Sequence, residues 1–238
     1  MIRRLLACLA TTAACLAGGT VDAQAPLLVP QEIVLYVHSD LKNTDFVEGL
    51  VCELSRVLAA PVRAATVDLP LRADYKASPS QLAPAKLAAP LARATAGDGG
   101  GRLFKYLLLP YDLKSEPFRY VFAETYGAPY LIGVVSTARL APAGAGLSRK
   151  AEADVTLQRV YKLVLKSVAR MAGYTKPEGC VLAFPRDLAE LDKKSAEFCD
   201  EDRAALIDAG ILKAKPFGAC TSVAGIAPAL RADAIALR

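Results

Sequence analysis

Histidine is almost absent from this sequence, since His38 is the only one among 238 residues. A metal centre held by three imidazoles is therefore impossible, whatever the fold. The same scarcity argues against serine or cysteine hydrolases, whose nucleophile needs a nearby base. His38 itself ends an apolar run, and we interpret it as a solvated or hydrogen-bonded residue at a strand end rather than as a catalyst.

A strong net charge is also missing. The chain has 29 basic and 24 acidic residues, which gives a net charge of +5. Removal of the first segment, which contains Arg3, Arg4 and Asp22, would leave a net charge of +4. This balance is too modest to favour a nucleic-acid partner. No later segment has the length and apolarity of a membrane helix, and no repeat or linker divides the chain. We expect one globular domain without a membrane anchor after processing.

Residues 1–23 have the form of a secretory signal peptide. A basic head with Arg3 and Arg4 is followed by a short apolar stretch and by small residues, and cleavage after Ala23 fits the small-x-small preference. A lipoprotein would carry its lipid on Cys15, but no large aliphatic residue lies three positions before that cysteine. The interpretation favours a periplasmic or secreted protein over a lipoprotein.

Four cysteines would remain after cleavage, and an even number in an oxidising compartment allows disulfides. The count alone leaves three complete pairings open. The four are Cys52, Cys180, Cys199 and Cys220.

The hydrophobic pattern predicts an α/β fold. Short β-rich runs alternate with segments of helical periodicity, and Gly, Pro and polar turn residues separate them. We expect strands at residues 32–38, 62–69, 103–110, 118–127 and 130–140. We expect helices at residues 45–60, 80–94 and 152–173.

The helix at residues 152–173 has two distinct sides. Its apolar side chains form one stripe, while four cations follow at steps of three, four and four on the other side, namely Arg159, Lys162, Lys166 and Arg170. One interpretation is a solvated helix face. The other is a cleft that binds an anion or an acidic peptide, with Lys176 as a fifth cation. A Ser-Lys catalytic pair of Ser167 and Lys166 is disfavoured, because adjacent helical residues diverge by about 100°.

Several ordered motifs resemble the archaemetzincins, a family of metzincin zinc proteases. The segment "KSVARMAGYTK" stands where the family has His-Glu-x-x-His-x-x-Gly-x-x-His. The stretches "LPYDL", "VFAETYGAPYLIGVVSTARL" and "CVLAFPRDLAELDKKSAEFC" also match family segments in order. The resemblance covers about residues 32–209 and implies a metzincin-like single domain, with a mixed twisted sheet and about three main helices.

The resemblance also identifies the active-site positions, and these have lost the family's chemistry. Lys166, Arg170 and Lys176 replace the three histidines, and Ser167 replaces the catalytic glutamate. Gly173 is retained. Leu182 stands at the methionine turn.

The family's second zinc has four cysteine ligands, of which two survive. Pro177 and Asp202 replace the first and fourth, while Cys180 and Cys199 remain. The resemblance therefore implies that these two sulfurs lie close enough to form a disulfide, with two buried thiols as the alternative. A bridge between Cys52 and Cys220 is not expected, because nothing in the pattern places the tail.

These observations predict an exported, catalytically inactive relative of the zinc proteases. The domain would span residues 24–216, with residues 217–238 as a tail outside the family pattern. It would bind an acidic peptide or a small anion in the former cleft, through Arg159, Lys162, Lys166, Arg170 and Lys176, and an extended peptide would add to the edge strand at Val121–Glu124. It would need no metal or cofactor. The alternatives are a peptidase with an unrecognised site and a purely structural or interaction protein.

Overall fold

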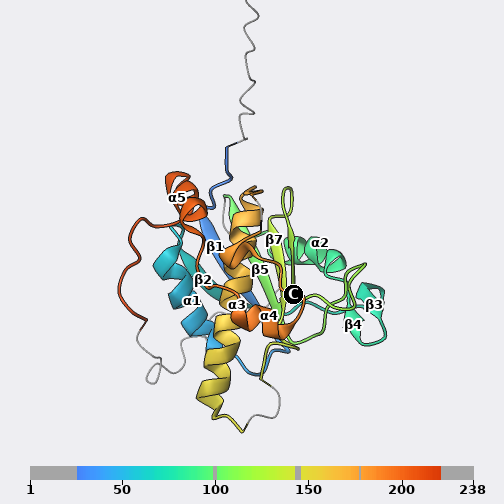
Figure 1. Ribbon diagram of the computed structural model, residues 1–238. Coiled ribbons are helices and arrows are strands. Elements are labelled where there is room, and N and C mark those ends of the chain that lie inside the picture. Colours follow the sequence, from blue (N-terminus) through green and yellow to red (C-terminus); the bar gives the residue numbers. More distant parts are fainter. Residues whose placement is uncertain (1–25, 99–100, 143–145, 177, 221–238) are drawn as a thin grey trace, which may run out of the picture.

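The computed structural model describes residues 26–98, 101–142, 146–176 and 178–220. The expected signal peptide and residues 221–238 of the tail lie outside the described residues. A five-stranded sheet with the order β2-β1-β5-β7-β6 forms the centre of the molecule (Figure 1). Its strands are β1 (Glu32–His38), β2 (Val62–Val67), β5 (Leu103–Leu109), β6 (Ala123–Tyr126) and β7 (Ile132–Ser136).

The sheet is mixed, as expected. β1, β2, β5 and β7 are parallel, whereas β6 pairs antiparallel with β7 at one edge. The central strands β1 and β5 are buried on both faces, which explains why they appear in the sequence as nearly continuous apolar runs, with Lys105 as the polar residue inside β5. The short, polar β6 carries no such run because it lies at the edge of the sheet.

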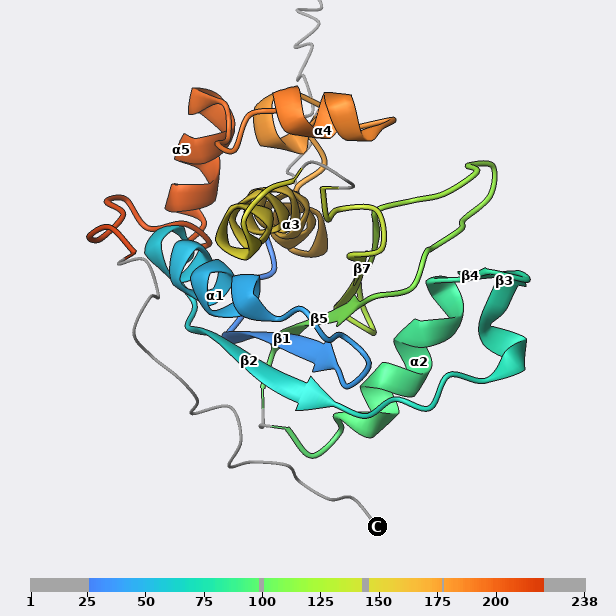
Figure 2. The same ribbon diagram turned by 90° about the horizontal axis from the view of Figure 1, so that it is seen from below.

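Helices cover both faces of the sheet (Figure 2). α1 (Asp45–Val57) and α3 (Arg149–Met171) pack on one face against Ile33 and Leu35 of β1. α2 (Ala85–Ala94) packs on the other face against Val34 and Tyr36. The alternation of β1 side chains between the two clusters follows from the period of two in a strand. Beside α2 lie η1 (Ala73–Tyr75) and a two-stranded sheet of β3 (Lys76–Ser78) and β4 (Gln81–Leu82).

The C-terminal segment folds back over the outer side of α3 (Figure 2). It contains η2 (Cys180–Leu182), α4 (Leu188–Lys193) and α5 (Asp200–Asp208). A disulfide joins Cys180 to Cys199 within this segment, so the pairing implied by the resemblance is present. The described residues therefore contain three main helices and two short ones, and the fold class is confirmed.

A second disulfide joins Cys52 of α1 to Cys220, so our expectation against this bridge was wrong. The chain before Cys220 runs along α1: Ala59 N donates to the carbonyl of Ile211, and Arg56 Nε donates to the carbonyl of Phe217 at 3.2 Å. The tail thus begins on the surface of α1. No sequence motif predicts this position of the tail.

Several element boundaries differ from the prediction, including those of β7, which is shorter than the strand expected at residues 130–140. The helix expected at residues 80–94 begins only at Ala85, because residues 76–82 form β3 and β4. α1 ends at Val57, since Leu58 forms a bridge with Leu212 instead of a further turn. The strand expected at residues 118–127 is reduced to the four residues of β6. Among the described helices, none has the length and apolarity needed to cross a membrane.

Candidate functional site

α3 brings the positions of the former active site to its last two turns. Ser148 caps its N-terminus, where the side chain accepts a hydrogen bond from Ala151 N at 3.3 Å. The helix ends at Met171, and the chain turns two residues later at Gly173, whose φ of +90° lies in the left-handed region that favours glycine. The retained glycine therefore has the expected role of turning the chain.

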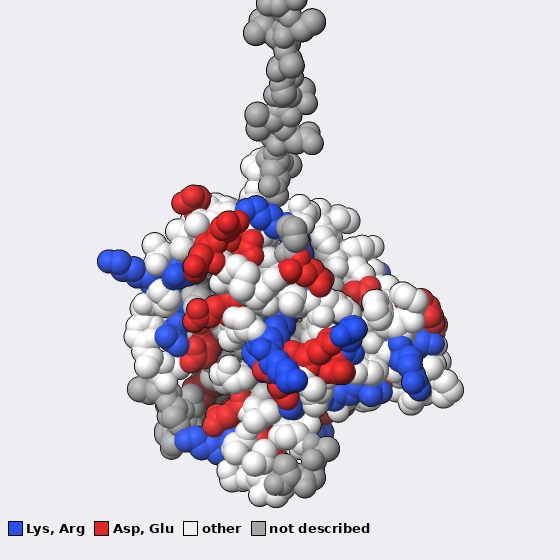
Figure 3. Space-filling model, viewed as in Figure 1, with Lys and Arg blue, Asp and Glu red and all other residues white. Residues whose placement is uncertain are grey.

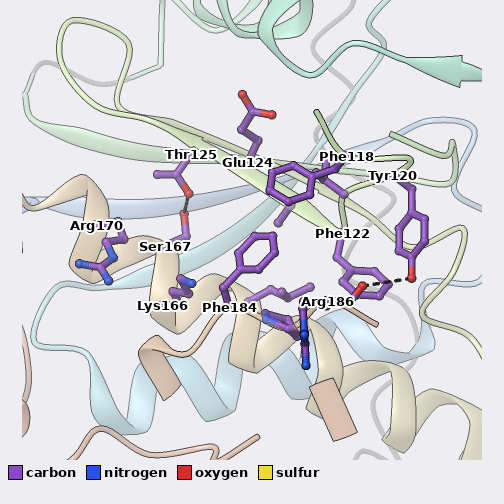
Figure 4. Close-up of a pocket in the computed structure, with 14 residues that line it drawn as sticks. Phe118, Tyr120, Phe122, Glu124, Thr125, Lys166, Ser167, Arg170, Phe184 and Arg186 are labelled. Carbon is purple, nitrogen blue, oxygen red and sulfur yellow. Dashed lines mark hydrogen bonds between the residues drawn. The ribbon is translucent and has the colours of Figure 1, made fainter. Parts of the chain in front are cut away.

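A cavity of about 250 Å³ lies between α3, the edge strand β6 and the segment after η2 (Figure 4). Residues Val121–Thr125, which belong to β6 and to the segment just before it, form one wall, with Phe118 and Tyr120 beside them. α3 contributes the second wall and the chain at Phe184–Arg186 the third. The α3 residues are Leu163, Lys166, Ser167 and Arg170. Three of the degenerate active-site positions thus line one cavity with the edge strand, as the resemblance implies.

Ser167, at the position of the catalytic glutamate, is fixed by the edge strand. Its hydroxyl lies 2.6 Å from the hydroxyl of Thr125, and only 3% of the residue is exposed. Gly133 of β7 makes room beneath it, because a Cβ there would lie 2.5 Å from the ring of Tyr106 and 3.2 Å from Ser167 Oγ. The Tyr106 hydroxyl is buried without a hydrogen-bond partner among the described residues, and burial raises its pKa.

Lys166, at the position where the resemblance implies the first histidine, is partly buried and lies between Arg170 and Phe184 (Figure 4). Its Nζ is 3.4 Å from Glu178 Oε1 and 5.2 Å from the centre of the Phe184 ring. The other oxygen of Glu178 accepts a hydrogen bond from Phe184 N at 3.0 Å. Burial lowers the pKa of Lys166, Glu178 opposes this shift, and the positive charge of Arg170 adds to it.

Arg170, at the position of the second histidine, turns back toward its own chain. Its Nη1 donates to the carbonyls of Tyr174 and Lys176 at 2.8 and 3.0 Å. Lys176, at the position of the third histidine, is exposed and does not line the cavity. Leu182, at the methionine turn, is fully buried in the core below.

Arg159 and Lys162 are not available to a ligand, which corrects the predicted set of binding residues. Both are more than nine-tenths buried beneath α4. Arg159 forms a two-bond ion pair with Asp192 at 2.7 Å and donates to the carbonyl of Leu140. Lys162 Nζ donates to the carbonyls of Leu191 and Asp192. On the face in Figure 3, basic and acidic side chains are interspersed, so the helical spacing of the cations does not produce an open basic stripe.

Two features of this region were missed in the sequence. Lys194 is 8% exposed, and its Nζ has no hydrogen-bond partner among the described residues. Burial, together with the charges of Lys166 and Lys162, lowers the pKa of Lys194 to about 7. Lys194 belongs to a polar run that looks solvated, so no local signal marks it.

The second feature is an aromatic pair at the cavity. Phe118 and Phe184 pack together with ring centres 5.3 Å apart and remain substantially exposed.

The residues at the positions where the resemblance implies a catalytic zinc do not fit the metal. Protonated lysine and arginine have no lone pair to donate, and the Ser167 hydroxyl is already bound to Thr125. His38 cannot replace them, because Nε2 lies 2.9 Å from the carbonyl oxygen of Leu69 and Nδ1 accepts from Asp40 N. This confirms its interpretation as a hydrogen-bonded strand-end residue.

At the positions where the resemblance implies ligands of a second zinc, the structure has covalent and hydrogen-bonded contacts. Cys180 and Cys199 are joined to each other, and the buried Asp202 accepts a hydrogen bond from the Tyr174 hydroxyl at 2.6 Å. Burial and Asp202 raise the pKa of that tyrosine. Among the described residues, no group of three or more His, Cys, Asp or Glu side chains could hold a metal ion.

Comparisons with known proteins agree with this geometry. The model of peptidase family M54 matches residues 140–206, which contain α3, η2, α4 and most of α5. A zinc-dependent peptidase from Methanocorpusculum labreanum is similar in structure, with a TM-score of 0.62 and 23% identity over 73% of this chain and 99% of that one. Archaemetzincin from Methanopyrus kandleri has a TM-score of 0.58 and 22% identity over 76% of this chain and 95% of its own.

Archaemetzincin from Archaeoglobus fulgidus, in a complex with malonate, has a TM-score of 0.56 and 20% identity, covering 73% of this chain and 98% of its own. No curated protein matches this chain. At these identities the structural similarity establishes the fold. Together with the match to the family model, it confirms the resemblance to the archaemetzincins that the sequence motifs indicate.

Proposed function

We propose that this chain, which has the fold of the archaemetzincin peptidases, is an exported and catalytically inactive protein that binds extended peptides in the former active-site cleft. One observation carries the proposal: the cavity between α3 and β6 is retained, while the residues at the zinc-ligand and catalytic positions are Lys166, Ser167, Arg170 and Lys176. A cleft that has its walls but lacks zinc ligands and a catalytic glutamate can still bind a ligand.

The chemistry of the lining argues against peptide hydrolysis. A zinc peptidase needs a bound metal to lower the pKa of the attacking water, and these side chains cannot coordinate one. Ser167 could attack a carbonyl only with a base beside it, but its hydroxyl is paired with that of Thr125. His38 is buried and hydrogen-bonded at both ring nitrogens.

The exposed edge of β6 supports a peptide ligand. Ser136 N donates to the carbonyl of Phe122, so in this antiparallel register Phe122 and Glu124 bond to β7. The backbone groups of Ala123 and Thr125 then point away from β7, toward the cavity side. Within the described chain they bond to no other segment. An extended peptide can add to such an edge while a side chain enters the adjoining cavity.

Export is supported by cysteine chemistry. The two disulfides use all four cysteines beyond the expected signal peptide, and disulfides persist in oxidising compartments. This observation agrees with a signal peptide at residues 1–23, which remains a prediction.

Selection from a random peptide library, followed by titration of the selected peptides, tests the proposal. We expect peptides that bind and are recovered uncut. Ala123→Pro removes one outward N–H without removing a β6–β7 hydrogen bond, so it should weaken binding about tenfold or more. Ala123→Ser keeps the N–H at the same position and serves as the matched control, with thermal melting as the check on folding. Failure to select any peptide, or cleavage of the selected ones, would refute the proposal.

A further inference from the structure

The cavity has two chemically different ends (Figure 4). At one end Lys166 and Arg170 lie beside the paired hydroxyls of Ser167 and Thr125. The other end is aromatic, with Phe118, Tyr120 and Phe122 along the strand side. Phe184 lies between the two ends. A ligand that fills the whole cavity therefore needs an anionic group close to an apolar one.

The positive charge at the first end is incompletely balanced. Arg170 donates only to neutral carbonyls, and none of the described carboxylates forms an ion pair with it. Lys166 has one carboxylate partner, Glu178, at 3.4 Å, and that carboxylate also accepts from Phe184 N. A third cation at the cavity, Arg186, is already neutralised, because its Nε donates to Glu190 at 2.9 Å. Arg170 and Lys166 are therefore the cations of the site that can still pair with an anionic ligand.

The edge strand limits where a peptide can reach this charge. Thr125 is the last residue of β6 with backbone groups that face outward. The chain then turns at Gly127–Tyr130, where Tyr130 N donates to the carbonyl of Gly127. Beyond Thr125, the described chain offers no further strand edge with which a peptide could pair. A bound peptide therefore stops pairing with β6 at the point where it reaches Lys166 and Arg170.

We infer that the cavity recognises the C-terminal carboxylate of a peptide whose last residues are apolar, with Arg170 and Lys166 as the carboxylate-binding pair and the aromatic end as the side-chain pocket. This inference rests on the proposed function and adds the class of ligand. Guanidinium and ammonium groups form charge-assisted hydrogen bonds with carboxylates, and two donors in a partly buried site discriminate strongly against a neutral amide.

Three fluorescein-labelled hexapeptides test the inference by fluorescence anisotropy with the full mature protein. The first is Gly-Ser-Gly-Val-Leu-Phe with a free C-terminus, the second is its C-terminal amide, and the third is the amide with aspartate in place of valine. We expect the first to bind about tenfold or more tightly than the other two. Arg170→Gln should remove this preference, whereas Arg186→Gln, a cation at the same cavity, should preserve it.

Each outcome has a separate meaning. Equal binding of acid and amide, both weakened by Ala123→Pro, would leave the proposed function intact and overturn the carboxylate inference. Binding of the aspartate peptide as tightly as the free acid would overturn the assignment to a C-terminal carboxylate. If neither these peptides nor any library peptide binds, the proposed function itself fails.

Discussion

The hydroxyl of Ser167 lies 2.6 Å from that of Thr125, so a hydrogen bond connects the last turns of α3 to the edge strand β6. The resemblance to the archaemetzincins implies a catalytic glutamate at this helix position. Here that position carries a contact between the two walls of the cavity. This contact ties the last turns of α3 to β6 and so helps to fix the distance between two walls of the cavity.

The first prediction concerns metal content. Protein exported through its own N-terminal segment and purified without a histidine tag should contain far less than one zinc per chain, because lysine and arginine cannot ligate the ion and the two former cysteine ligands are bonded to each other. Elemental analysis after dialysis measures this, together with a peptidase assay with and without chelator. Near-stoichiometric zinc with chelator-sensitive cleavage would contradict the prediction.

The second prediction concerns the buried cation Arg159. Arg159→Leu should lower the free energy of unfolding by about 2 kcal/mol or more, since it leaves the carbonyl of Leu140 and the carboxylate of Asp192 without their partner. Lys150→Leu, on the exposed first turn of the same helix, should change it by less than about 0.5 kcal/mol. Urea denaturation of both variants decides, and equal effects would restore the solvated-face interpretation.

The third prediction separates the two disulfides. Replacing Cys52 and Cys220 by alanine opens a sequence separation of 168 residues, and replacing Cys180 and Cys199 opens one of 19. The chain-entropy model gives losses of about 5 and about 3 kcal/mol respectively. Only the second change should increase hydrogen exchange at Phe184, because that bridge encloses the third cavity wall. Equal exchange at Phe184 in both variants would contradict a role for the Cys180–Cys199 bridge in holding the cavity.

The fourth prediction concerns pH and Lys194. Its pKa in the folded protein is about 7, against 10.5 for a free lysine, so between these values the unfolded chain holds a proton that the folded protein lacks. The free energy of unfolding should therefore rise with pH across this window, and the penalty is fully present below pH 7. Lys194→Met removes the charge from a site near Lys162 and Lys166 of α3 and Glu178.

We expect this variant to be more stable than the parent near pH 6.5 and to lose most of that advantage near pH 10. Lys193→Met, at an exposed neighbouring position, is the control and should leave the pH dependence unchanged. Denaturation curves at several pH values provide the measurement. Parallel pH profiles for Lys194→Met and the parent would show that Lys194 stays charged and solvated.

The sequence predicted the parts of the fold that local patterns encode. β1 and β5 are apolar runs bounded by turn residues, and α3 has an apolar stripe of helical periodicity that ends near Gly173, so each was located within a few residues. The start of α2 could not be predicted, because β3 and β4 form through pairing with each other and, at Leu82, with the segment around Leu113. The Cys52–Cys220 bridge was missed for the same reason, since it depends on a contact across 168 residues.

The candidate site was predicted in position but not in chemistry. Motif alignment correctly placed Lys166, Ser167 and Arg170 beside the edge strand. Helical periodicity cannot tell whether a polar face meets water or another segment, so Arg159 and Lys162 appeared exposed although α4 covers them. The burial of Lys194 is likewise a property of packing between segments.

The Cys52–Cys220 bridge closes most of the domain into a covalent ring that includes four of the five sheet strands and contains the Cys180–Cys199 bridge within it. One backbone cut between Cys52 and Cys220 opens this ring without dividing it, so a protein nicked by an external protease remains a single covalent molecule. β1 is the strand outside the ring, although it lies between β2 and β5. A cut between His38 and Cys52 therefore detaches an inner strand of the sheet, whereas a cut within the ring detaches nothing.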